Sequence, residues 1–193
     1  MEIRDFFLEQ FDTVCGFVHE CIKGLTDDQL KYQPKEGLNS IAWLMWHTAR
    51  CQDFINTLIS PGRKQVLNAE WMAQLNVARH DIGTGMTREE CAEFNQAINV
   101  GALHVYCDAV AEAVRDVAHT VTAEDLRKPV DSRQLDKMLE DGTIANERAK
   151  WVPGFLDGKS RGWLLSMAVW HMAEHTLGGV VCTRRIMGIP VGH

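Results

Sequence analysis

Three histidines have the spacing and surroundings that could hold a metal ion. His47 falls on the apolar stripe of one predicted helix, and His171 and His175 lie four residues apart on the stripe of another. A buried histidine is costly unless a partner satisfies its ring, and four residues make about one helical turn, so His171 and His175 point the same way. Two helices that present imidazoles to one core can hold a divalent ion with one coordination position open, which suits catalysis better than a structural role.

A single core histidine is best interpreted as a hydrogen-bonding residue, whereas three that converge favour a metal. Neutral imidazoles suit zinc, nickel, iron or copper. We expect zinc, with nickel, iron or manganese as the alternatives. A weak internal repeat, which aligns Trp46-His47 with Trp170-His171, supports the choice of His47 as the third ligand.

Glu174 and Cys51 are the two further candidates at this site. Glu174 is next to His175 and could act as a general base or orient a ligand, although a solvated or paired carboxylate is the simpler interpretation. We name Glu174 as the candidate catalytic residue. Cys51 lies one turn after His47 and could be a fourth ligand, but a small buried apolar side chain is the better interpretation.

Two other metal motifs fit the chain poorly. The run from His171 to His175 matches the H-x-x-E-H pattern of inverted zinc proteases, but that site needs an acidic ligand further along, and no Asp or Glu follows His175. A ferritin-like di-iron centre needs two E-x-x-H motifs, and the sequence contains none.

The elements that must position these residues are helices. Apolar residues recur every three or four positions and predict four long helices, over residues 3–23, 40–59, 87–119 and 162–187. Shorter helices are expected near residues 68–77 and 132–139, and no run of alternating polarity predicts a strand. The connection over residues 60–86 is long enough to cross a bundle. The second and third helices should therefore run parallel, in an all-α, up-down-down-up four-helix bundle.

Composition limits the class of protein. The 193 residues fit one domain, residues 1–193, and the net charge of −6 argues against a nucleic-acid partner. No apolar run is long enough to span a membrane, and the N-terminus does not read as a signal peptide. The six cysteines form no C-x-x-C pair, which indicates reduced thiols in the cytoplasm. The pair Gly178-Gly179 on the last helix permits close contact between helices or between subunits, and together with several tryptophans it predicts a homodimer. The alternative is a monomer whose glycines only ease packing between its own helices.

The chain resembles the DinB-like (YfiT-type) four-helix metalloproteins. Three segments carry the resemblance: residues 37–47 (GLNSIAWLMWH), the crossover over residues 71–87, and the pattern H-x-x-x-H-x-x-G that starts at His171. The resemblance implies a bundle with a three-histidine site of His47, His171 and His175, open to a pocket, and frequent homodimers.

Related members use a low-molecular-weight thiol such as mycothiol or bacillithiol in S-transfer or isomerisation. We therefore expect a metal-dependent enzyme that activates a thiol or water to act on a small-molecule substrate. The alternatives are a non-catalytic metal-binding or stress-response protein and a metal-dependent hydrolase.

Overall fold

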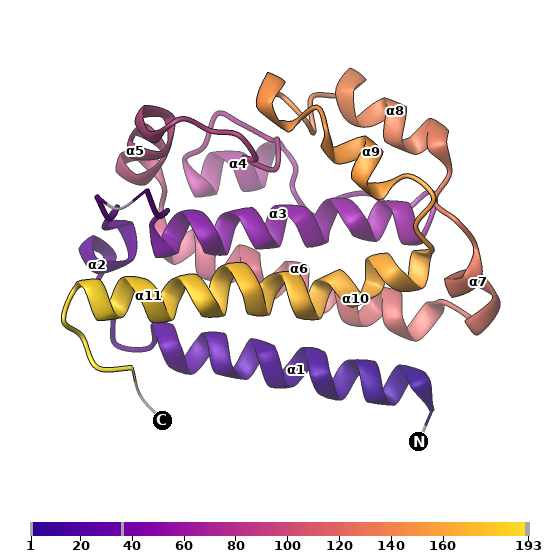
Figure 1. Cartoon of the computed structure of the whole chain (residues 1–193), viewed down its shortest axis with the longest axis horizontal. Helices are drawn as coiled ribbons and strands as arrows, with labels where there is room; N and C mark the ends of the chain where they lie inside the picture. Colours follow the sequence, from indigo (N-terminus) through magenta and orange to yellow (C-terminus); the bar gives the residue numbers. More distant parts are fainter. Residues whose placement is uncertain (1, 36, 192–193) are drawn as a thin grey trace.

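The computed structural model, which describes residues 2–35 and 37–191, contains four long helices with shorter helices packed beside them (Figure 1). The long helices are α1 (Ile3–Ile22), α3 (Ile41–Ile59), α6 (Val100–Thr120) and a composite last helix of α10 (Arg161–His171), η2 (Met172–Leu177) and α11 (Gly178–Ile186). The described residues form no strand, so the prediction of an all-α fold is confirmed.

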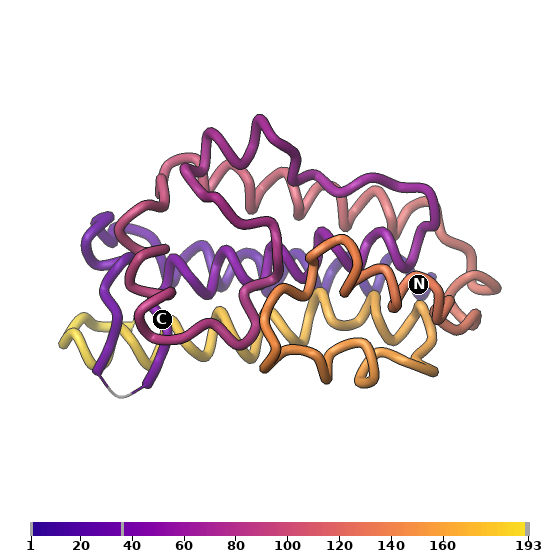
Figure 2. Tube along the Cα trace, turned by 90° about the horizontal axis from the view of Figure 1, so that it is seen from above, coloured from indigo at the N-terminus to yellow at the C-terminus, as the bar shows by residue number. Residues whose placement is uncertain are grey.

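The four long helices form a ring. α3 packs against α6 and the last helix, and α1 packs against the same two helices on the other side. α3 and α6 run in one direction, whereas α1 and the last helix run in the opposite one (Figure 1). The order follows from the connection after α3, which returns the chain to the end of the bundle where α3 began (Figure 2).

α3 is the central element of the bundle. Every residue from Ile41 to Ile59 is buried except Thr57, including the charged pair Arg50 and Asp53. The sequence pattern predicted a single apolar stripe, because it could not show which elements would cover the polar face. The connection after α3 and the helices between α6 and α10 supply that cover. Side chains on opposite faces of α3, His47 among them, are therefore shielded from water.

The third predicted helix is wrong in one respect: residues 87–119 form two helices, α5 (Arg88–Ala97) and α6. The backbone is extended at Ile98, with φ −56° and ψ 131°. Asn99 then starts α6, because its side chain accepts a hydrogen bond from the backbone N–H of Ala102, while its own N–H donates to the carbonyl of Leu75. These local bonds break the helix even though the apolar spacing continues. Thr87 and Glu90 form a capping box at the start of α5.

Short helices fill the connections. α2 (Asp27–Lys31) follows α1, and α4 (Ala69–Leu75) lies in the crossover. Between α6 and α10 the chain forms α7 (Ala123–Arg127), α8 (Ser132–Glu140), η1 (Glu147–Ala149) and α9 (Val152–Leu156). The short helices predicted near residues 68–77 and 132–139 are thus confirmed as α4 and α8. Met138 of α8 and Leu156 of α9 share one apolar cluster with Phe54 of α3, so this segment covers the second half of α3.

Two further findings concern the described residues. None of the helices combines the length and the apolar character that crossing a membrane requires. The six cysteines are all free, in agreement with the absence of a disulfide pattern in the sequence.

Candidate metal centre

The three predicted histidines converge at one point in the middle of the bundle. The ring centroid of His47 lies 5.3 Å from that of His171 and 5.6 Å from that of His175, and the centroids of His171 and His175 are 4.4 Å apart. His47 comes from α3, whereas the other two come from the facing last helix. The fold therefore brings together the residues that the spacing singled out.

The last helix carries a π-helical turn at this point, which the sequence analysis did not predict. Residues Met172–Leu177 form the turn, and the N–H of Gly178 donates to the carbonyl of Ala173, five residues back. His171 precedes the turn and His175 lies within it, so the pair is not held on the regular α-helix that the i,i+4 spacing indicated. π-helical turns are rare and occur often at functional sites, because the wider turn redirects side chains.

Gly179 allows the last helix to approach α3 just beyond the π-helical turn. A Cβ atom at this position would overlap the side chain of Leu44 on α3. The prediction that the paired glycines permit a close approach is thus explained, for Gly179, by a contact within the chain. Gly178, in contrast, has room, because its nearest neighbour would be the carbonyl oxygen of Ala173 at 3.7 Å.

His47 is oriented by the crossover and by its own helix. Its Nδ1 lies 2.6 Å from the carbonyl oxygen of Ile82, and a carbonyl can only accept, so Nδ1–H donates and Nε2 keeps its lone pair. Trp43, one turn earlier on α3, stacks on the ring with centroids 4.7 Å apart. A histidine whose second nitrogen is held by a backbone carbonyl is the arrangement that commonly orients a metal ligand.

Two of the histidine rings, those of His47 and His171, are uncharged near neutral pH. Burial lowers the pKa of His47 to about 4, although the hydrogen bond to Ile82 opposes this change. Burial also lowers the pKa of His171 to about 3, with His47 and His175 as further causes. Among the described residues, the rings of His171 and His175 have no hydrogen-bond partner, so no protein group competes for their nitrogens. Imidazoles with accessible nitrogens are a donor set that fits a divalent metal.

Cys51 lies directly beside this group. Its Sγ is 3.8 Å from Nε2 of His47, and donor atoms of His47, Cys51 and His171 all lie within 4.8 Å of one another. Burial raises the pKa of the Cys51 thiol to about 12, so it is protonated in the metal-free protein. The ring centroids place His175 beside His47 and His171, whereas the donor atoms that lie closest together are those of His47, Cys51 and His171.

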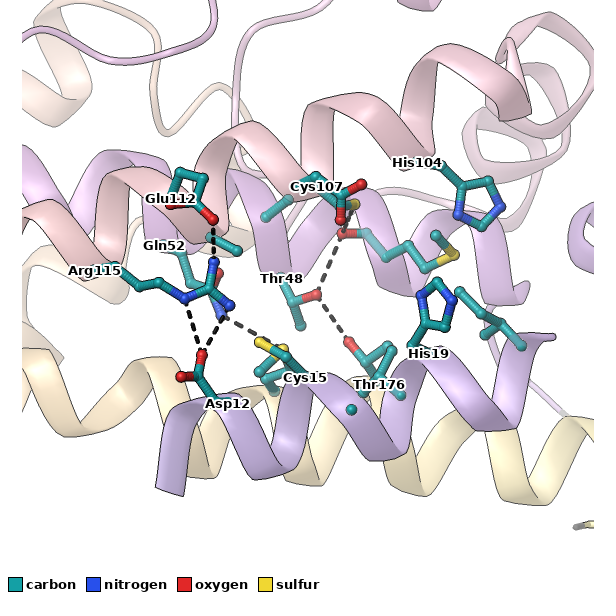
Figure 3. Close-up of a pocket in the computed structure, with 18 residues that line it drawn as sticks. Asp12, Cys15, His19, Thr48, Gln52, His104, Cys107, Glu112, Arg115 and Thr176 are labelled. Atoms are coloured by element: carbon teal, nitrogen blue, oxygen red, sulfur yellow. Dashed lines mark hydrogen bonds and ion pairs between the residues drawn. The ribbon is translucent and has the colours of Figure 1, made fainter. Parts of the chain in front are cut away.

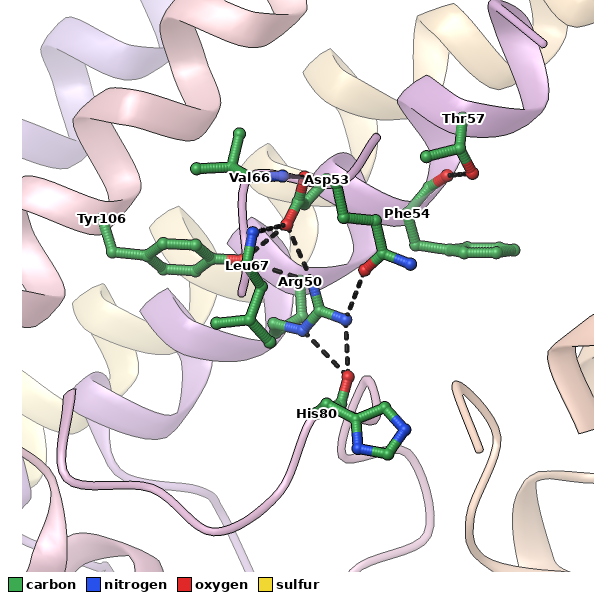
Figure 4. A network of polar contacts seen from close by, with 9 residues as sticks. Arg50, Asp53, Phe54, Thr57, Val66, Leu67, His80 and Tyr106 are labelled. Atoms are coloured by element: carbon green, nitrogen blue, oxygen red, sulfur yellow. Dashed lines mark hydrogen bonds and ion pairs between the residues drawn. The ribbon is translucent and has the colours of Figure 1, made fainter. Parts of the chain in front are cut away.

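A buried polar network fixes the crossover that carries Ile82 (Figure 4). Arg50 of α3 forms an ion pair of 2.9 Å with Asp53 and donates to the carbonyl of His80, two residues before Ile82. Both charged side chains are 1% exposed. Because an unpaired charge is costly at this depth, the network strongly favours one position of the crossover.

Asp53 binds the beginning of the same connection. Its carboxylate accepts hydrogen bonds from the backbone N–H groups of Val66 and Leu67, at 2.6 and 2.9 Å, and from the hydroxyl of Tyr106 at 2.9 Å. This pair was not predicted from the sequence. The available signal was two opposite charges three residues apart in a helix with no other Asp, Glu, Lys or Arg, a pattern that usually marks an exposed face.

The histidines lie at the edge of a cavity of about 390 Å³. Residues from α3, from the crossover, from α8 and α9, and from the last helix line it. This volume is in the range of small-molecule sites. Ring nitrogens that face such a cavity can act on a ligand that enters it.

Comparison with models of known protein families identifies the family of the chain. A model of the DinB superfamily matches residues 10–177, a range that includes His47, His171 and His175. The chain belongs to the DinB superfamily. Among solved structures, it is similar to a crystal structure described as a conserved protein of locus from Enterococcus faecalis. The TM-score is 0.71 and the identity 21%, over 97% of this chain and 99% of that chain. At this identity the likeness shows the fold alone. No curated protein matches the chain.

In this DinB-superfamily chain, Glu174 is exposed and lines the cavity next to the histidines. Among the described residues, its carboxylate has neither a hydrogen bond nor an ion pair. The sequence analysis favoured a solvated or paired carboxylate for Glu174. The structure places it in contact with the cavity and without a partner, so a ligand in the cavity can reach its oxygens.

A second cavity, of about 640 Å³, lies between α1 and α6 on another side of this DinB-superfamily bundle (Figure 3). Thr48 and Thr176, neighbours of His47 and His175 in the chain, line it and share a hydrogen bond of 2.8 Å. Arg115 pairs with Asp12 across it at 2.8 Å. Its polar side chains are thus largely paired with one another.

The remaining histidines do not join a metal-binding group. His80 and His119 are exposed, and His19 and His104 line the second cavity. His193 lies outside the described residues. Apart from His47, Cys51 and His171, no group of three close metal donors occurs in the described part of the chain.

Proposed function

We propose that the chain is a metal-dependent enzyme that activates a thiol or water for S-transfer or isomerisation of a small molecule. The observation that carries the proposal is the convergence of three imidazoles, those of His47, His171 and His175, at the edge of a cavity. Zinc suits this donor set best, with nickel, iron or manganese as alternatives. A bound divalent metal would supply a Lewis acid that lowers the pKa of a thiol or water.

The side chains around the site have separate roles in this proposal. The carbonyl of Ile82 holds His47 in the tautomer whose Nε2 is free, which orients a ligand atom before any metal arrives. Apolar walls exclude water and so strengthen electrostatic interactions inside the cavity. The carboxylate of Glu174, which lines the cavity, accepts the proton that the thiol or water loses.

Three ligands rather than four are central to catalysis. If Cys51 completed a site of four protein donors, no position would remain for a substrate, and a non-catalytic metal-binding or stress-response role would follow. A hydrolase is the alternative if water rather than a thiol is activated. The six free cysteines support a reducing compartment, and we propose the cytoplasm.

Calorimetry with and without metal tests the thiol reaction. In buffers of different ionisation enthalpy, a thiol such as 2-mercaptoethanol should release about one proton on binding to the zinc-loaded protein. It should bind much more weakly to the metal-free protein. If no small thiol binds or releases a proton when zinc is present, thiol transfer is ruled out, and hydrolysis or simple metal binding becomes the better account.

A further inference from the structure

We propose that the cavity beside the three histidines selects molecules with an uncharged, flat apolar group, such as an aromatic ring, and disfavours thiols that carry a carboxylate on the part that lies along its walls. The part of this inference that concerns a donor atom at the histidines rests on the proposed function. The part that concerns the apolar group rests on the cavity walls alone.

A continuous row of aromatic rings leads from the surface to the histidines. Ring centroids are 5.7 Å apart for Trp151 and Phe155, 5.5 Å for Phe155 and Trp163, and 5.7 Å for Trp163 and Trp170. Trp170 in turn meets His171 at 5.9 Å. All four contacts are edge-to-face, the geometry that aromatic pairs prefer, so the rings hold one another in place.

The outer rings of this row are exposed at the cavity. Trp151 is 58% exposed and Phe155 is 41% exposed, and both line the cavity together with Trp170 and Trp43. Neighbouring large aromatic side chains rarely remain in water without a function. An apolar ligand that covers them removes their surface from water, and each Å² of apolar area contributes about 25 cal/mol.

The charged residues of the cavity lining also favour an uncharged ligand. Of the described residues that line the cavity, one is acidic, Glu174, and none is a lysine or an arginine. Lys159 lies over the rings of Phe155 and Trp163, at 5.9 and 5.1 Å from the centroids, but does not line the cavity. A carboxylate on the part of a ligand that lies along the walls, away from the histidines, would therefore lose water without gaining a lysine or arginine partner, and Glu174 would repel it.

Three thiols that share one donor atom test the selectivity of the walls. Calorimetry on the zinc-loaded protein should show that phenylmethanethiol binds about tenfold more tightly than 2-mercaptoethanol, because its ring covers apolar wall. 4-(Mercaptomethyl)benzoate, whose carboxylate is too far from the sulfur to bind the same metal ion, should bind more weakly than phenylmethanethiol. The inference is overturned if 4-(mercaptomethyl)benzoate binds as tightly as phenylmethanethiol.

A change at the cavity entrance separates the walls from the histidines. Trp151→Ala should weaken phenylmethanethiol binding about fivefold and leave the affinity for 2-mercaptoethanol unchanged, because only the first ligand reaches the ring. Trp151 is exposed, so the change does not disturb the core. Tyr32→Ala is the matched control, because Tyr32 is 40% exposed and lies outside the cavity. Equal loss of affinity for both thiols in Trp151→Ala would contradict a role in apolar selection.

Toluene, which has no metal-binding group, distinguishes this inference from the proposed function. It should quench or shift the tryptophan fluorescence of the metal-free protein saturably, and less so in Trp151→Ala. If toluene binds but the protein holds no metal, the aromatic selectivity stands and the proposed function fails. The opposite result is that zinc and 2-mercaptoethanol bind, but toluene does not bind and phenylmethanethiol binds no more tightly than 2-mercaptoethanol. The aromatic selectivity then fails and the proposed function stands.

Discussion

His47 shows how its immediate surroundings set the chemistry of one side chain. Burial keeps the ring neutral, its Nδ1–H donates a hydrogen bond to the carbonyl of Ile82, and Trp43 stacks against one face. Only Nε2 is left to react. Cys51, one turn further, is close to the same nitrogen but carries a thiol whose pKa burial raises to about 12. In the metal-free protein His47 therefore has a nitrogen ready to bind a metal, whereas Cys51 must first lose a proton.

Cobalt spectroscopy should show that Cys51 is not a ligand. In the cobalt-substituted protein we expect ligand-field bands without a sulfur-to-cobalt charge-transfer band, and Cys51→Ser should leave both the spectrum and the metal content unchanged. A strong charge-transfer band that disappears in Cys51→Ser would mean that Cys51 occupies the fourth coordination position. The proposal of a catalytic site would then fail.

The stability of the metal-free protein should fall as the pH falls below about 6.5. The folded-state pKa values of His47 and His171, about 4 and about 3, lie below the ordinary value of 6.5, so the unfolded chain binds more protons between these limits. Because one pKa unit corresponds to about 1.4 kcal/mol, urea unfolding should show a loss of a few kcal/mol between pH 7.5 and 5. His171→Phe should flatten this slope, and a wild-type stability independent of pH would contradict the burial of neutral rings.

At the scale of elements, sequence reasoning succeeded where local signals agree with packing. Ser40 caps α3, Thr87 caps α5, and the apolar spacing located α1, α3 and the last helix. The π-helical turn could not be predicted, because its widening depends on how the last helix fits against α3 and α1. The prediction that His171 and His175 lie near His47 still holds, because a widened turn presents both rings to the same side.

The two adjacent glycines of α11 offer a matched test of that fit. Gly179→Ala should destabilise the protein by about 1–3 kcal/mol, because the added Cβ overlaps Leu44 and the packing must shift. Gly178→Ala has room and a helical backbone, so it should be neutral or stabilising by up to about 1 kcal/mol. Urea unfolding of both variants measures the difference. Equal effects would mean that close approach to α3 is not what Gly179 provides.

At the scale of the whole molecule, the homodimer is still a proposal. Gly179 contacts α3 of its own chain, so the glycine pair is no longer an argument for it. A different feature supports association: Ile3, Phe6 and Phe17 share one face of α1 and are 70%, 49% and 58% exposed. A second copy of the same face would cover them in a two-fold dimer.

Light scattering over a wide concentration range tests this proposal. We expect the mass of two chains, and we expect Phe17→Glu to shift the protein towards one chain, because a charge would then enter an apolar interface. The mass of a single chain at every concentration would rule out the dimer. Circular dichroism of Phe17→Glu controls for the fold.

The measurement that tests the central claim most directly is the metal content of the purified protein and of three single variants. Mass spectrometry of metals should find about one zinc ion per chain in the wild type, as three histidine ligands and an open position require. His47→Ala, His171→Ala and His175→Ala should each lose most of it while keeping the helical circular dichroism spectrum. A wild-type protein without bound metal under metal-replete conditions, or a His175→Ala variant with full metal content, would contradict the three-histidine site.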